Sequence, residues 1–351
     1  MRNLTYFTFN SFVFFIVLYS FSSCRQSNNF CELSFYHWKS ELYISPQEQV
    51  YLDSINVKKI YLHFFDVDYD FNKKETKPLA PLIVKKSPIN ISEIVPTVFI
   101  TNRTLLQLEE HELPVLSNHI FKKINDLTKN LKQFSINEIQ IDCDWSEKTK
   151  WRYFRLLTIL KNQIQSNSWQ LSATIRLHQI KFFKRTGVPP VDRGMLMFYN
   201  MGDLENPESE NSILNLDIAK QYLVNFDQYP LSLDLALPIF SWGVLFRDGK
   251  MIKLLNQLDE LELSDKERFL KVDQNRYEIV KSTYLHGHYL YQNDLIRIEK
   301  ISTKNLHDAV QILQGHLKKE DRHLVFYHLD TTTIKHFPYE SLKELGQKFN
   351  N

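Results

Sequence analysis

Eight short apolar runs divide this chain, and amphipathic stretches separate most of them. Short apolar runs bounded by polar segments are typical of buried strands, whereas apolar residues that recur every three to four positions indicate helices. The chain therefore alternates between predicted strands and predicted helices. The predicted strands are Leu33–Trp38, Lys59–Phe65, Ile94–Thr101, Glu138–Cys143, Gln170–Arg176, Gly194–Asn200, Leu231–Phe240 and Leu324–His328.

The first predicted helix carries the clearest start signal. Ser45 precedes Pro46, and Glu48 stands three residues after the serine, which is the capping-box spacing. The other predicted helices rest on apolar periodicity. Together the predicted helices are Pro46–Ile55, Pro114–Phe134, Glu147–Ile164, Asp217–Val224, Lys250–Leu258, Thr303–Leu317 and Tyr339–Phe349.

This alternation predicts an α/β fold of the (β/α)8 TIM-barrel type over residues 32–351. Residues 67–92 are expected to form a long insertion after the second strand. Residues 262–300 are expected to form a small α+β insertion between strands seven and eight. The alternative is a doubly wound open sheet, but no glycine-rich phosphate loop follows any predicted strand, which favours the barrel.

The fourth predicted strand carries two acidic residues on one face. Successive side chains of a strand point to opposite sides, so Asp142 and Asp144 share a face with Gln140. In a barrel the apolar face turns outward to the helices, and the acidic face turns inward. Arg176, at the inward-facing end of the next strand, is expected to lie beside these carboxylates. Such a group either performs acid–base chemistry or forms a buried ion-pair network that fixes strand register.

Polar and aromatic residues end most of the predicted strands, which is where barrel active sites lie. Asp144 and Asp142 are the catalytic candidates. Further residues are expected to bind substrate at the same end of the barrel. These candidates are Arg176, Tyr199, Trp242, Asp330, His37, Trp38 and Asp66.

The N-terminus predicts export. Arg2 precedes the apolar run 12–18, which is too short for a transmembrane helix, and Phe21-Ser-Ser-Cys24 resembles a lipoprotein lipobox. Residues 1–23 are therefore expected to be a signal peptide. Lipidation at Cys24 would tether the protein through residues 24–31 to the membrane of a bacterial envelope. The remaining alternative is an ordinary cleaved signal peptide.

The composition narrows the choice of partners. Without Arg2, the sequence has 42 Lys and Arg against 41 Asp and Glu, a net charge of +1, which argues against nucleic acid as a partner. The spacing of Cys31 and Cys143 predicts neither a metal site nor a disulfide. We therefore expect no cofactor. Aromatic residues form 13% of the chain, enough for a large core and for a carbohydrate-binding cleft.

The fourth strand, Ile139-Gln-Ile-Asp-Cys-Asp-Trp145, resembles the Asp-x-x-Asp-x-Asp-x-Glu signature of family 18 glycoside hydrolases, the chitinase-like barrels. Leu171–Thr174, Met195–Met201 and Ala236–Gly243 resemble the later strands of that family. The resemblance implies a role for Tyr199 in holding a substrate acetamido group. The chain is also similar to lipoproteins of Bacteroidetes-type bacteria that share stretches such as Phe99–Arg103 and Val188–Arg193.

The sequence departs from this signature at its ends. Ile139 stands at the first Asp, and Ser146 stands at the catalytic Glu, with Glu147 one residue late. The family mechanism needs that Glu as general acid, and a serine cannot protonate a leaving group.

Three functional hypotheses remain. The first is an envelope barrel that hydrolyses or otherwise processes a glycan at its C-terminal mouth. The second is a non-catalytic barrel that binds a sugar or a partner protein, which the missing Glu favours. The third is metal-dependent hydrolysis by His37, His178 and His328, but no His-x-His pair stands at a strand end.

Overall fold

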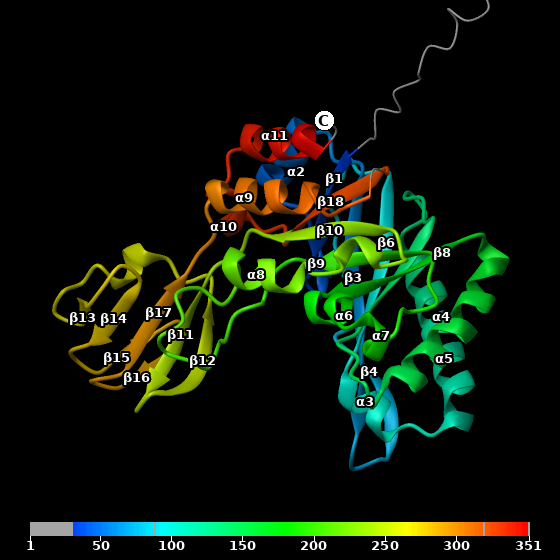
Figure 1. Ribbon diagram of the computed structural model, residues 1–351, viewed down its shortest axis with the longest axis horizontal. Helices are drawn as coiled ribbons and strands as arrows, with labels where there is room; N and C mark the ends of the chain where they lie inside the picture. The colour runs from blue at the N-terminus through cyan, green and yellow to red at the C-terminus, as the bar shows by residue number, and fades with distance from the viewer. Residues whose placement is uncertain (1–30, 88, 319, 350–351) are drawn as a thin grey trace, which may run out of the picture.

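A computed structural model describes residues 31–87, 89–318 and 320–349 (Figure 1). The predicted signal peptide 1–23, Cys24 and residues 25–30 of the predicted tether lie outside the described residues. No helix within the described ranges is long and apolar enough to cross a membrane.

A closed barrel of parallel strands forms the centre of the structure (Figure 1). β1 pairs with β18 on one side and with β3 on the other, which closes the sheet and excludes the open alternative. Around the barrel from β1 the order is β18, β10, β9, β8, β7, β6 and β3. The strands are β1 (Cys31–His37), β3 (Lys59–Asp70), β6 (Glu93–Ile100), β7 (Glu138–Asp142), β8 (Gln170–Arg176), β9 (Arg193–Met197), β10 (Leu233–Pro238) and β18 (Arg322–Tyr327).

Helices follow most of the barrel strands. Apolar stripes bury them; in α4, for example, Leu116, Ile120 and Ile124 are buried. The capping box predicted at Ser45 is present at the start of α2. The helices are α2 (Pro46–Ser54), α3 (Asn102–Gln107), α4 (Leu113–Thr128), α5 (Lys150–Ile164), α6 (Leu177–Lys181), α7 (Phe183–Thr186), α8 (Leu216–Tyr222), α9 (Thr303–Gln314), α10 (Thr331–Ile334) and α11 (Tyr339–Phe349).

The connection between β3 and β6 contains strands where a barrel usually has a helix. β3 continues to Asp70 and turns back antiparallel into β4 (Glu75–Leu79), and the short strand β5 (Ile83–Val84) pairs with β2 (Glu41–Leu42). Pro78 and Pro81 oppose a helix here because proline cannot donate within a helix interior.

A second sheet is inserted after β10 and lies beside the barrel in Figure 1. It has its own core, including Leu245, Phe269 and Ile296. Its antiparallel order is β12 (Lys250–Asn256), β11 (Trp242–Arg247), β17 (Leu295–Glu299), β14 (Arg276–Ile279) and β13 (Phe269–Lys271), with a separate hairpin of β15 (Thr283–Leu285) and β16 (His288–Leu290).

The inserted sheet starts earlier than the predicted insertion 262–300, and the helix predicted over Lys250–Leu258 is wrong. This segment is mainly strand β12, paired with β11. The turn between them is Asp248-Gly249, with positive φ values of 50° and 72°. An Asp-Gly pair in this conformation connects two strands tightly, so the turn chemistry overrides the helical periodicity.

Polar side chains from β1, β7 and β8 meet in the barrel interior. The Tyr36 hydroxyl donates to Gln140 at 2.5 Å, Gln140 donates to Ser172 at 3.3 Å, and Ser172 donates to Glu138 at 2.5 Å. These side chains come from β1, β7 and β8. The chain of hydrogen bonds therefore joins strands across the interior and satisfies buried polar groups that would otherwise destabilise the fold.

Ion pairs fill the end of the barrel where the strands begin. Lys59 lies 2.9 Å from Glu93 and 3.6 Å from Glu138, and Arg193 lies 2.8 Å from Asp234. Burial raises the pKa of Glu138 to about 7, although Lys59 and Ser172 oppose the shift. β1 enters the barrel at this end, which we call the base.

Candidate functional site

Asp142 lies at the end of β7 inside the opposite end of the barrel, the mouth. Its side chain is buried, and the Thr174 hydroxyl of β8 donates to it at 2.6 Å. Burial raises the pKa of Asp142 to about 6; Arg176 opposes the shift and Asp144 adds to it. This carboxyl group therefore exchanges its proton near neutral pH, within the range useful for acid–base chemistry.

Asp144 lies above Asp142, and half of its side chain is exposed. Arg176 binds it with both arms of the guanidinium, with Nε 2.6 Å and Nη2 3.2 Å from the two carboxylate oxygens. The expected pairing of Arg176 with this acidic pair is thus present. Burial alone would lower the pKa of Arg176, but the pairing with Asp144 raises it.

Aromatic rings form a continuous group around the mouth, and they come from different parts of the barrel. Tyr327, the last residue of β18, is central to it. Its ring centroid lies 5.4 Å from that of Tyr199, 5.7 Å from Phe240 and 5.9 Å from Trp38, and Phe240 lies 5.1 Å from Trp242. The Arg176 guanidinium lies 5.9 Å from the Tyr199 ring, so the aromatic group and the acidic pair adjoin.

Trp242 is held in this group by a buried acidic residue of the inserted sheet. Its indole N–H donates to Glu299 at 2.9 Å, and the backbone N–H and hydroxyl of Ser212 donate to the same oxygen. Arg297, also fully buried, donates to the other Glu299 oxygen at 2.7 Å. Arg297 further donates to the carbonyls of Leu204 and Asn206, so the loop after β9 is fixed to the insertion.

A bulge in β3 turns Asp66 toward the barrel interior. The register against β6 shifts between His63 and Phe65, so Phe64 is the additional residue. The bulge reverses the alternation beyond it, and Asp66 joins His63 on the inward face. The two side chains lie 2.7 Å apart. Asp66 also contributes to raising the pKa of Asp142, as expected of a carboxylate at the same mouth.

Two predicted substrate-binding residues do not fit that role. His37 is completely buried, and burial lowers its pKa to about 4, so it is a neutral core residue. Asp330 forms the N-cap of α10 and pairs with Lys39 at 2.7 Å, so its carboxylate is already occupied. His37 lies at the end of the first predicted strand and Asp330 lies just after the last, but neighbouring groups shield both residues from a ligand.

The position of the signature Glu belongs to the turn that precedes α5. The backbone N–H of Ser146 donates to the Thr149 hydroxyl at 2.9 Å, and that hydroxyl donates to Asn102 at 2.6 Å. Glu147 is 62% exposed and lies 3.4 Å from Arg185, a residue of α7. Neither residue therefore places a carboxyl group beside Asp144.

Sequence reasoning missed several members of the site. Thr174 lies on the inward face of β8, and its alternation with Arg176 was a usable signal. Tyr327 precedes the predicted candidate His328 by one position. Strand alternation alone does not decide which of the two faces the mouth. His63 lies on the inward face of β3 before the bulge, so its alternation with Tyr61 was a usable signal. Glu299 had no usable signal, because a distant loop buries it.

Comparisons with solved structures agree with this architecture. The spore cortex-lytic enzyme SleL of Bacillus cereus has a TM-score of 0.54 and 13% identity, covering 92% of this chain and 74% of that one. The C-terminal domain of a putative chitinase from Desulfitobacterium hafniense DCB-2 has a TM-score of 0.56 and 12% identity, covering 92% and 100%. The GH18 chitinase ChiB of Flavobacterium johnsoniae has a TM-score of 0.52 and 11% identity, covering 92% and 94%.

The chain has the barrel fold of these glycoside hydrolases. At this identity the likeness concerns the fold alone. No protein-family model matches the sequence, and no curated protein matches it.

The raised pKa of Asp142 predicts a pH-dependent stability difference. The folded-state pKa of about 6 exceeds the ordinary value of 3.8, so the ionised carboxylate disfavours the folded state. The protonated carboxyl group favours the folded state below pH 4, and this contribution is lost as the pH rises through 6. The unfolding free energy of Asp142→Asn minus that of wild type should therefore be more favourable at pH 8 than at pH 4, by on the order of 3 kcal/mol. Urea denaturation across this range measures it, with exposed Asp227→Asn as control, and parallel curves for Asp142→Asn and wild type would contradict the prediction.

Glu299→Gln should destabilise the inserted sheet. The substitution leaves the buried Arg297 guanidinium without its counter-charge, a change that typically costs about 3–5 kcal/mol. We expect a lower urea midpoint and altered Trp242 fluorescence. Glu278→Gln, on β14 of the same sheet, is the matched control because Glu278 forms no ion pair with any described residue. Equal midpoints for the two variants would show that the buried pair does not hold the insertion.

Proposed function

We propose that the protein binds a glycan at the mouth of its barrel. The observation that carries this proposal is the aromatic group Trp38, Tyr199, Phe240, Trp242 and Tyr327 beside the exposed Asp144–Arg176 pair. Within this group Trp38, Trp242 and Tyr327 are partly exposed and offer apolar surface to sugar rings, and the buried Tyr199 and Phe240 pack against them. The charged pair offers both acceptors and donors to hydroxyl groups. The barrel fold shared with chitinases and with SleL supports a carbohydrate ligand.

Binding without turnover is the first form of this proposal. The family-18 mechanism needs an acid over the glycosidic oxygen, but Ser146 lies in the turn before α5 and Glu147 pairs with Arg185. Hydrolysis is the second form, favoured by the raised pKa of Asp142 and by the carboxylate of Asp66 at the same mouth. In that form Asp142 and Asp144 would be the catalytic pair, and Asp66 would bind the substrate.

A glycan screen with Ser146→Glu separates the two forms. Wild type and an Asp144→Asn variant are tested for binding and for release of reducing ends on envelope, host and chitin-type glycans. The binding form predicts affinity without turnover in wild type, at least about tenfold weaker binding in Asp144→Asn, and turnover on introducing Glu at position 146. Ser264→Glu, at an exposed position of the insertion, is the control.

Turnover by wild type that Asp144→Asn abolishes would instead support hydrolysis. If wild type binds none of the glycans, the proposed function is wrong.

We further propose that the mature protein is a lipoprotein of a bacterial envelope, anchored through Cys24. The support is the apolar run 12–18 followed by Phe21-Ser-Ser-Cys24. In a host that processes lipoproteins, wild type should fractionate with membranes and carry a lipid mass on its N-terminal peptide. Cys24→Ser should lose that mass and enter the aqueous fraction. Cys31→Ser, a change in β1, is the control, and unchanged partitioning of Cys24→Ser would contradict the anchor.

A further inference from the structure

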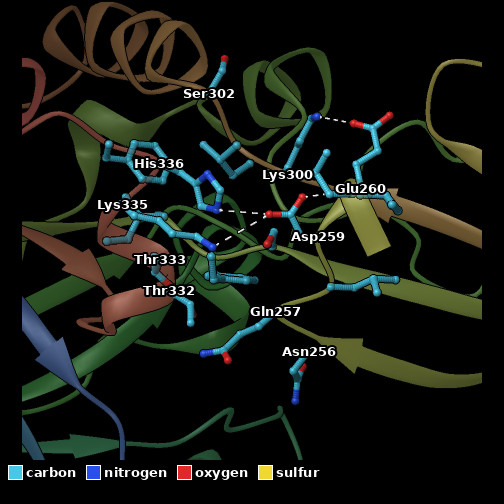
Figure 2. Close-up of a pocket in the computed structure, with 18 of the residues that line it drawn as sticks. Asn256, Gln257, Asp259, Glu260, Lys300, Ser302, Thr332, Thr333, Lys335 and His336 are labelled. Carbon is cyan, nitrogen blue, oxygen red and sulfur yellow. Dashed lines mark hydrogen bonds and ion pairs between the residues drawn. The ribbon is translucent and has the colours of Figure 1, made fainter. Parts of the chain in front are cut away.

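A cavity of about 1040 Å3 lies at the junction of the barrel and the inserted sheet (Figure 2). One wall is the turn from Asn256 to Glu262, and the other is the segment from Thr332 to Phe337 that follows β18. Asp142, Asp144, Arg176 and Tyr199 do not line it. Phe240 lines the cavity and also contacts the aromatic group of the mouth, so the two sites adjoin without coinciding.

The inner surface of the cavity is apolar. Phe240, Leu258 and Phe337 are buried residues that line it, and Ile298 of β17 adds to the same surface. Polar side chains stand around this surface (Figure 2). An apolar floor with convergent polar groups, at a junction between two structural units, is the usual form of a small-molecule site.

The charges of the lining cancel. Three lysines and three carboxylates line the cavity, so the net charge is zero with neutral histidines. Glu260 is already paired with Lys300 at 2.7 Å and with Lys271 at 2.6 Å. Asp259 faces Lys335 at 4.0 Å and His336 at 3.9 Å across the cavity (Figure 2). A strongly charged ligand would therefore leave part of this lining uncompensated.

Two amide side chains at the cavity are available to a ligand. Asn256 and Gln257 are exposed, and neither side chain forms a hydrogen bond with another residue of the described ranges. Each amide both donates and accepts. Asp259 adds an acceptor and Lys335 adds a donor, so the cavity offers donors and acceptors side by side.

We propose that this cavity is a second saccharide site, which binds a neutral sugar unit of the glycan whose binding at the mouth is proposed above. Sugar hydroxyls donate and accept at once, which matches the mixed lining, and the carbon face of the ring packs on Phe240 and Phe337. A neutral ligand also leaves the Asp259–Lys335 pairing intact. The inference rests on the proposed function, and it adds a binding site that the mouth does not contain.

The test follows both sites in the full chain, in a zwitterionic detergent without sugar groups, by NMR titration with chitotetraose. The Trp242 indole N–H reports the mouth, and the Asp259 amide reports the cavity. In wild type both signals should shift. Gln257→Ala should weaken the cavity response at least tenfold and leave the mouth response unchanged; Asn256 is kept because it pairs with Trp242 across β11 and β12. The matched control is Gln133→Ala, which removes the same side chain from an exposed loop.

Asp144→Asn separates this inference from the proposed function. It should weaken only the response of Trp242. If the Asp259 amide does not shift, or shifts equally in the cavity variant, the second site is wrong while the mouth proposal stands. If the cavity responds and the mouth does not, the second site stands and the mouth proposal falls. No response from either signal overturns both.

Discussion

Closure of the barrel by β1 is the constraint on which the site depends. β1 pairs with β18 and with β3, so one face of every barrel strand is enclosed. Polar side chains on that face must then find partners inside the barrel, because unpaired buried polar groups are costly. The hydrogen bonds from Tyr36 through Gln140 and Ser172 to Glu138 meet this requirement below the mouth. Arg176 and Thr174 meet it at the mouth.

Asp142 and Asp144, two residues apart at the end of β7, differ in depth and in partners. Asp142 is enclosed and bonded to the Thr174 hydroxyl, and its pKa is raised to about 6. Asp144, two residues further, reaches solvent and pairs with Arg176. The same period-two pattern therefore supplies one carboxyl group enclosed by the barrel and one that reaches solvent. The barrel wall positions the aromatic rings around them, and the insertion adds Trp242 through its buried Glu299.

The sequence predicts the parts of the structure that obey a simple period. The strand alternation around Asp142 and Arg176 places both residues correctly, and the apolar stripe of α4 predicts its buried face. Bulges and tight turns interrupt the period, and periodicity does not predict them. The bulge at Phe64 changes which side of β3 faces inward, and the Asp248-Gly249 turn converts an apparent helix into a hairpin. His37 illustrates a further limit. It lies on the opposite face of β1 from the inward Tyr36, and neighbouring residues cover it completely.

β1 enters the barrel at the base, so the start of the described chain lies opposite the mouth. Cys31 begins β1 at the end opposite the acidic pair. Six residues separate it from Cys24, so the covalent reach over the seven Cα–Cα steps is at most about 25 Å. A lipid on Cys24 would hold the ion-paired end close to the bilayer. The mouth, with its aromatic rings, would then face away from the bilayer, where an extracellular or periplasmic polymer could reach it.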